Sequence, residues 1–157
     1  MEQKHHSVKE MWRNYLISIG EDIIHTDKNY ISWHFCDNEK DANDLAQLVK
    51  QNVKRATTGL HYSYEIDGEE LPKVGDLNII TDWHGMAQCI VETTKVTILP
   101  FNKVTEELAQ IEGEGDQSLK YWQEAHRSAF SRRLKEYDME FREDTLVVFE
   151  EFEIVYK

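Results

Sequence analysis

The chain has 157 residues, of which 40% are hydrophobic and 11% aromatic, which is enough apolar material for one packed core and excludes a disordered chain. The formal net charge of −12 disfavours binding to long duplex nucleic acid, because such binding depends on Lys and Arg side chains that neutralise phosphates. The apolar runs are only as long as a strand and there are two cysteines, so we expect no membrane-spanning or secretion segment, no disulfide framework and a cytoplasmic protein.

An amphipathic helix is predicted near the N-terminus. Ser7 and Glu10 have the spacing of a capping box, and apolar residues recur at helical spacing from there to Gly20. Residues 30–35 are aromatic and β-branched, which predicts a short extended segment. Residues 1–36 are therefore expected to form an N-terminal helical extension that packs on the rest of a single domain.

A second helix is predicted to begin at Asp37 or Asn38, either of which is a good N-cap. Its apolar side leads the chain to Lys54, and the residues that follow, 56–58, read as the start of a strand. Residues 59–76 are rich in turn-forming residues, so we expect a loop there.

The C-terminal half is predicted to contain most of the sheet. Residues 77–81 and 87–99 form a hairpin pattern around a turn, and residues 146–156 form a last strand. Helices are expected at residues 104–111 and after the N-cap Ser118, with a glycine-containing acidic loop between them. The pattern predicts an α+β fold in which helices flank a small, mostly antiparallel sheet or β-barrel.

Several common catalytic and metal-binding motifs are missing from the sequence. There is no paired His or Cys spacing typical of zinc, no phosphate-binding or dinucleotide-binding glycine motif, and no serine-hydrolase elbow. We therefore expect neither a metal nor a cofactor.

Lys54 and Thr57 are the candidate reactive pair. A threonine hydroxyl becomes a nucleophile when a base takes its proton, and a lysine serves as that base when desolvation or a neighbouring cation such as Arg55 lowers its pKa. A structural interpretation is also open, in which Lys54 ends a helix and Thr57 begins a strand. Glu112 likewise is either a third member of the site or one of several solvated carboxylates.

Several motifs in order resemble the ASCH domain, a PUA-like β-barrel family linked to RNA and coactivator functions. Asn52-x-Lys54-x-x-Thr57 is similar to the G-x-K-x-x-T signature of that family, with Asn in place of the first Gly. The other segments that carry the resemblance are 33–35, 71–76, 91–94, 100–101, 112–116 and 121–122 with His126. The resemblance implies a PUA-like β-barrel flanked by helices, with residues 1–36 as an added segment.

The resemblance also implies candidate activities. One branch of the family hydrolyses N(4)-acetylcytidine with a lysine, a threonine and a glutamate, which correspond by motif position to Lys54, Thr57 and Glu112. Another branch cleaves single-stranded RNA. Gly59 stands where the first branch carries an arginine, so the chain departs from the pattern of that branch at this position.

Three hypotheses follow for the ligand. In the first, a nucleoside or related amide is hydrolysed in a pocket where Trp33, Tyr121, Trp122 or His126 stacks a base. In the second, the cleft binds single-stranded RNA or a nucleotide without catalysis, and Lys54 and Arg55 contact phosphate. A variant of this hypothesis is that the cleft also cleaves the single-stranded RNA. In the third, the protein binds only a macromolecular partner. The sequence leaves the oligomeric state open.

Overall fold

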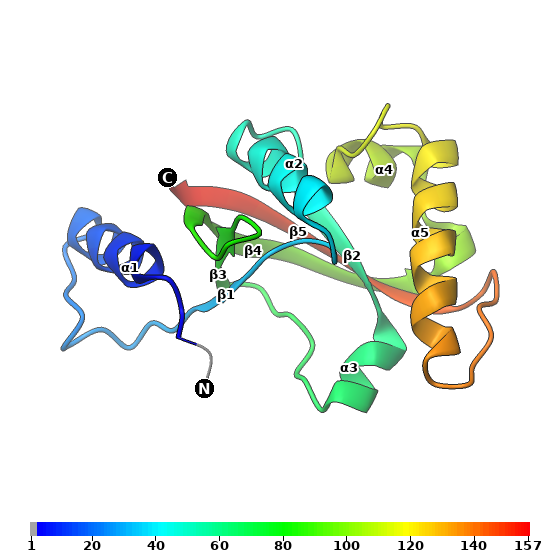
Figure 1. The fold of residues 1–157 in the computed structure, drawn as a ribbon, viewed down its shortest axis with the longest axis horizontal. Coiled ribbons are helices and arrows are strands. Elements are labelled where there is room, and N and C mark those ends of the chain that lie inside the picture. The colour runs from blue at the N-terminus through cyan, green and yellow to red at the C-terminus, as the bar shows by residue number, and fades with distance from the viewer. Residues whose placement is uncertain (1–2) are drawn as a thin grey trace.

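A computed structural model describes residues 3–157. In chain order the elements are α1 (His6–Ser18), β1 (Ile31–Trp33), α2 (Glu39–Lys50), β2 (Ala56–Leu60), α3 (His61–Asp67), β3 (Leu77–Thr81), β4 (Ala87–Pro100), the 3₁₀ helix η1 (Phe101–Lys103), α4 (Glu106–Glu112), α5 (Leu119–Lys135) and β5 (Leu146–Tyr156). Figure 1 shows α1 at one end of the molecule and α5 at the other, with the strands and α2 between them.

The five strands form one curled sheet in the order β1-β3-β4-β5-β2. All neighbouring strands are antiparallel except β1 and β3, which are parallel. The predicted α+β fold with a mostly antiparallel sheet is confirmed. The sheet is a half-barrel and not a closed barrel, because β1 and β2 lie at its two edges and do not pair with each other. A cavity lies between these two edge strands.

Helix α1 packs on the sheet through an apolar cluster. Val8, Trp12 and Leu16 are buried against residues of β3 and β4, including Leu77 and Ile79. The spacing of the three helix residues places them on one face of α1, as the sequence predicts.

The other two clusters belong to α2 and α5. Ala46 and Val49 of α2 pack with Phe35 and with strand residues such as Ile80. Trp122 of α5 belongs to a separate cluster, whose other buried members are Leu60, Phe101, Val104, Ala109, Phe130, Leu134 and Val147. Helices α1, α2 and α5 therefore each pack on the half-barrel through a separate apolar cluster. A cavity remains between α2 and α5.

Local signals predicted most of the elements correctly. Asn38 caps α2 by accepting a hydrogen bond from the backbone N–H of Asp41, and Ser118 caps α5 in the same way. Helix α1 differs from the prediction, since His5 and not Ser7 is its N-cap. The Ser7 hydroxyl instead accepts a hydrogen bond from the backbone N–H of Ala87, which ties α1 to β4.

Helix α3 was not predicted by the sequence pattern. It has seven residues and none of them is buried, so it lacks the apolar stripe that identifies an amphipathic helix. It ends at Gly68, which adopts the left-handed conformation typical of a helix C-terminus.

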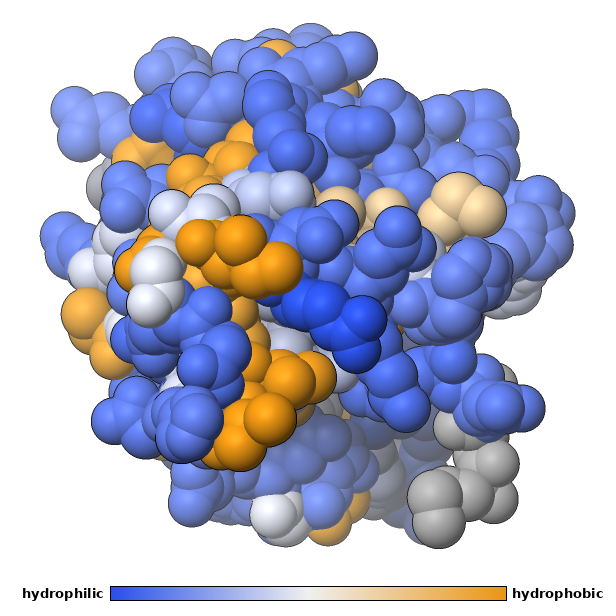
Figure 2. All heavy atoms as spheres, turned by 90° about the vertical axis from the view of Figure 1, so that its left-hand side faces the viewer, coloured by the Kyte–Doolittle hydropathy of each residue, from blue (hydrophilic) through white to orange (hydrophobic). Residues whose placement is uncertain are grey.

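Apolar side chains are exposed at the end of the molecule that carries α1. Ile17, Ile19, Ile23 and Ile24 are all exposed there. In the view onto this end, apolar groups lie between polar ones and do not form one continuous surface (Figure 2). Within residues 3–157, no helix combines the length and apolar character needed to cross a membrane.

Candidate functional site

Lys54 is fully buried at the junction between α2 and β2. Asn52 adopts a left-handed conformation with φ of 61°, and the backbone N–H groups of residues 53 and 54 both donate to the carbonyl of Leu48, so the chain turns sharply after the helix. Asn tolerates this conformation better than most residues, which explains how it replaces the glycine of the G-x-K-x-x-T pattern. The turn directs Lys54 into the interior.

The ammonium group of Lys54 is surrounded by acceptors. Its Nζ donates to the backbone carbonyl of Ala56 at 2.7 Å and to Oε1 of Glu114 at 2.8 Å, and it lies 3.6 Å from Oε2 of Glu112. The ring centroid of Phe35 is 5.0 Å from Nζ. Two carboxylates thus balance one buried cation, which is the arrangement that makes such burial tolerable.

Glu112 is the last residue of α4, and it is 1% exposed. Its Oε1 accepts hydrogen bonds from the hydroxyl of Thr58 and, at 2.9 Å, from the indole N–H of Trp122. Burial raises the pKa of this carboxyl, but the charges of Lys54 and His126 outweigh burial, and the net pKa is lowered. Glu112 is therefore a carboxylate at neutral pH.

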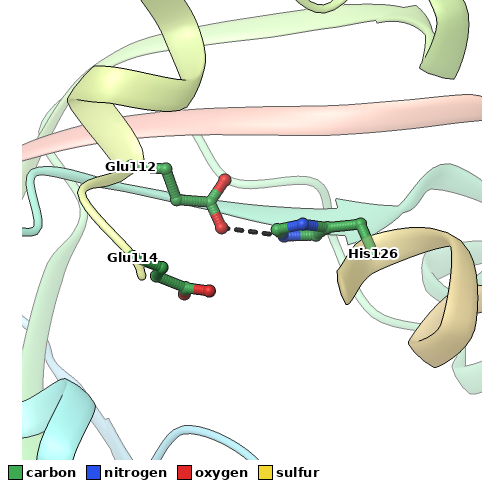
Figure 3. Close-up of side chains that lie close together, drawn as sticks. All are labelled: Glu112, Glu114 and His126. Carbon is green, nitrogen blue, oxygen red and sulfur yellow. Dashed lines mark hydrogen bonds and ion pairs between the residues drawn. The ribbon is translucent and has the colours of Figure 1, made fainter. Parts of the chain in front are cut away.

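His126 of α5 completes a buried network that also contains Lys54, Thr58, Glu112 and Glu114. Its Nδ1 lies 2.8 Å from the carbonyl of Trp122 and its Nε2 lies 2.8 Å from Oε2 of Glu112, the contact drawn in Figure 3. Both neighbours are acceptors, so both ring nitrogens carry a proton when both contacts are hydrogen bonds: Nδ1–H donates to the carbonyl of Trp122, and Nε2–H donates to the ionised Glu112. Burial lowers the pKa of His126, but the charge and hydrogen bond of Glu112 raise it more, and the net pKa lies above its ordinary value. The imidazolium also stacks on Trp122, with ring centroids 4.2 Å apart.

The two threonines of β2 differ in their surroundings. Thr58, and not Thr57, donates its hydroxyl to Glu112. Thr57 pairs with Glu150 of β5, and within residues 3–157 its hydroxyl makes no hydrogen bond to Lys54 or Glu112. Successive residues of a strand point to opposite faces, so Thr58 shares a face with the buried Ala56 and Leu60. That alternation was the signal in the sequence that could have identified Thr58.

Of the other residues predicted to bind the ligand, some belong to the buried network and others lie outside it. Trp122 and His126 belong to the network, and Tyr121, which is 41% exposed, lines the cavity beside it. Arg55 is exposed, and none of the carboxylates in residues 3–157 forms an ion pair with it. Trp33 lies in a different cavity, where its indole N–H donates to Asn78.

Two cavities meet at β2. The first has a volume of about 520 Å³ and lies between α2, β2, α4 and α5, with Glu112, Glu114 and His126 in its wall. The second has a volume of about 510 Å³ and lies between the edge strands β1 and β2. Both are lined by Thr57 and Thr58. We call them the network cavity and the edge cavity.

Glu112, Glu114 and His126 also have the composition of a metal site. Each offers one ligand atom, and these atoms lie within 4.8 Å of one another. Lys54 Nζ, however, is 2.8 Å from Glu114 and 3.6 Å from Glu112, so an ammonium group already binds two of the three groups that a metal ion would need. A divalent cation next to this buried ammonium would be repelled. The donor set fits Lys54 and does not fit a metal.

The curled, mostly antiparallel sheet flanked by helices defines the class of protein, a PUA-like domain. Residues 31–156 match the sequence pattern of the ASCH domain, and the chain belongs to the ASCH domain family. No curated protein matches the chain.

Solved structures support this membership. An ASCH domain from Lactobacillus crispatus JV V101 is 39% identical over 100% of this chain and 99% of its own, with a TM-score of 0.91. Protein EF3133 from Enterococcus faecalis V583 is 37% identical over 96% of this chain and 89% of its own, with a TM-score of 0.83. Hypothetical protein PH0355, at 16% identity and a TM-score of 0.51 over 80% of this chain and 96% of its own, shares only the fold.

Proposed function

We propose that this ASCH domain hydrolyses the amide of a small uncharged ligand, with N(4)-acetylcytidine as the model substrate. The observation that carries the proposal is the buried carboxylate of Glu112, which accepts the Thr58 hydroxyl on one oxygen and contacts His126 through the other. Ionisable groups with shifted pKa values are concentrated at functional sites, and their burial has a desolvation cost.

The arrangement supports a hydroxyl nucleophile. Glu112 accepts the proton of Thr58 Oγ1 while that oxygen bonds to the acetyl carbon. The C–N bond then breaks, and the proton passes from Glu112 to the leaving nitrogen. Water next attacks the acetyl ester, which releases acetate and restores the hydroxyl. Lys54 and His126 keep Glu112 ionised for the first step, but the low pKa that they cause also makes it a weak base, so we expect slow turnover.

Thr57 is the alternative nucleophile. It occupies the threonine position of the G-x-K-x-x-T pattern, and it lines both cavities. Thr58 has the better geometry, because it alone of the two contacts the carboxylate.

The size and charge of the network cavity favour a neutral ligand. A volume of about 520 Å³ lies within the usual range for small-molecule sites. Its wall contains four carboxylates, Asp41, Asp44, Glu112 and Glu114, which are offset by four cations, Lys40, Arg132, the imidazolium of His126 and the buried Lys54 behind the wall. Because these charges are already paired in number, the cavity has no surplus of cations to attract a phosphate group.

The proposal is tested by incubating the purified protein with N(4)-acetylcytidine and measuring cytidine by chromatography. We expect cytidine release by the wild type and by Thr57→Val, and a loss of roughly 100-fold or more in Thr58→Val and Glu112→Gln. Thr94→Val is the matched control, since Thr94 is exposed on β4, and it should keep full activity. A loss in Thr57→Val with an active Thr58→Val would assign the nucleophile to Thr57. No cytidine release by the wild type would refute the proposed activity.

A titration with labelled single-stranded RNA at low salt separates this proposal from RNA binding. We expect no association and no shortened oligonucleotide, because the chain is strongly acidic and the cavity walls carry carboxylates. Binding that weakens steeply as salt is added would favour an RNA-binding module, and shortened RNA would favour a ribonuclease.

A further inference from the structure

The edge cavity contains a buried amide whose amino group has no hydrogen-bond partner among residues 3–157. Asn78 of β3 is 6% exposed, and its Oδ1 accepts a hydrogen bond from the indole N–H of Trp33 at 2.8 Å. An indole N–H only donates, so this contact fixes which end of the amide is oxygen and which is nitrogen.

The amino group of Asn78 therefore faces the cavity. Within residues 3–157, Nδ2 donates to no acceptor, yet every side-chain polar atom that is sealed from solvent has a hydrogen-bond partner. Nδ2 must then be accessible, and the space that Asn78 lines is the edge cavity. A donor held in one orientation inside a cavity is typical of a group that recognises a ligand acceptor.

Glu150 is a second polar group in the same cavity. Its Oε2 accepts the Thr93 hydroxyl at 2.6 Å, while Oε1 has no hydrogen-bond partner within residues 3–157. Burial raises the pKa of this carboxyl, the hydrogen bond from Thr93 partly opposes the shift, and the charge of Asp76 adds to it. Glu150 can thus carry a proton more readily than an exposed glutamate, and in either form it can accept a hydrogen bond.

Two aromatic rings complete the cavity. Trp33 supplies one, and Tyr64 supplies the other from α3. The Tyr64 ring lies against Gly59, where an added Cβ would be 3.4 Å from the tyrosine oxygen. Burial raises the pKa of Tyr64 to about 12, so its hydroxyl stays neutral. Aromatic faces beside a neutral donor and a carboxyl suit a flat, uncharged heterocycle.

We propose that the edge cavity binds a nucleobase, with Asn78 donating to a ring or carbonyl acceptor and Glu150 accepting from a neighbouring N–H group. This inference rests on the proposed function in one respect: the cavities share Thr57 and Thr58, so a base held in the edge cavity lies next to the strand whose Thr58 contacts Glu112. In this proposal Asn78 and Glu150 recognise the base of the substrate, whereas Glu112 accepts the proton of Thr58 during hydrolysis.

The rim of the edge cavity selects against phosphate. Glu69, Glu70 and Asp76 line it, and among the residues that line it none is a lysine or an arginine. A nucleoside should therefore bind more tightly than the corresponding nucleotide.

The inference is tested by titrating the ¹⁵N-labelled full chain with cytidine and with cytidine monophosphate. Cytidine should shift the side-chain amide resonances of Asn78 and the indole resonance of Trp33, with the indole resonance of Trp12 unchanged, and the monophosphate should bind more weakly.

Asn78→Asp replaces the free donor by an acceptor and keeps an oxygen for Trp33, so cytidine affinity should fall about tenfold. Asn102→Asp, at an exposed position, is the matched control.

The results separate this inference from the proposed activity. No shift at Asn78 and Trp33 with cytidine, or equal cytidine affinities for Asn78→Asp and Asn102→Asp in folded protein, would overturn the base site. Cytidine binding at Asn78 without hydrolysis of N(4)-acetylcytidine would support the base site and refute the activity. Glu150→Gln provides a second variant if Asn78→Asp does not fold, and its cytidine affinity should also fall because the pattern of donors and acceptors changes.

Discussion

Each charged residue of the network depends on the others. Lys54, Glu112 and His126 come from three separate parts of the chain, and each is at most 8% exposed. A buried charge is tolerated only while its partner is present, and removal of one partner typically costs about 3–5 kcal/mol. The same contacts that suit Glu112 for a reaction therefore also stabilise the fold.

The pH dependence of stability should show this coupling at His126. Its folded pKa is raised above the ordinary value, so the stabilisation is complete below about pH 6.5 and is lost as the pH rises through the folded pKa. We therefore expect the free energy of unfolding in urea to fall as the pH rises from about 6.5 through the folded pKa of His126. His126→Gln should be less stable near pH 6 and should lack this part of the slope.

His25→Gln is the control for that measurement, because the His25 side chain is 80% exposed. It should follow the wild-type curve. A His126→Gln curve parallel to the wild type between pH 6 and pH 9 would contradict the coupling.

At the scale of elements, the end of α4 sets the position of both glutamates. Gly113 has φ of 75°, and a Cβ added there would lie 2.2 Å from the backbone carbonyl oxygen of Val53. Only glycine lets α4 end this close to the turn that presents Lys54. The approach of two backbones thus brings Glu112 and Glu114 to the lysine.

Gly113→Ala should consequently destabilise the protein by more than about 2 kcal/mol in urea unfolding, since it adds a backbone clash to the strain of a left-handed residue. Gly68→Ala is the matched control, because Gly68 has φ of 65° and nothing within 4 Å of its added Cβ. It should cost about 1 kcal/mol. Equal losses for both variants would show that the contact with Val53 is unimportant.

The elements were predictable from sequence where their signals are local. The N-caps Asn38 and Ser118 and the strands 77–81 and 87–99, which are rich in Ile, Val and Thr, all depend on neighbours in the chain. The burial of Glu112 was not predictable in this way, since its partners lie far away in sequence and an acidic, glycine-containing segment normally indicates a solvated loop. The family resemblance identified Lys54 and Glu112 as candidates, but the contact with Thr58 required the structure.

At the scale of the whole molecule, α1 lies outside the residues that match the family pattern, yet it covers part of the sheet. The ASCH pattern matches residues 31–156, whereas α1 spans His6–Ser18 and buries Trp12 against β3 and β4. Without α1, Leu77 and Ile79 would lose this cover. Helix α1 therefore shields apolar side chains of the sheet from water.

Trp12→Ala should lower the free energy of unfolding by about 3–5 kcal/mol, because Trp12 is 4% exposed and fills the contact between α1 and the sheet. Ile17→Ala changes a residue of the same helix that is 64% exposed and should change stability by no more than about 0.5 kcal/mol. Similar small effects for both variants in urea unfolding would show that α1 is not needed to cover the sheet.

The unpaired edges of the half-barrel have a consequence for the speed of binding. Because β1 and β2 leave the edge cavity open between them, a ligand can enter without the backbone first moving apart. Association should then proceed in a single step whose rate rises linearly with ligand concentration, without the plateau of a gated site. Differences in affinity between ligands should appear in their residence times.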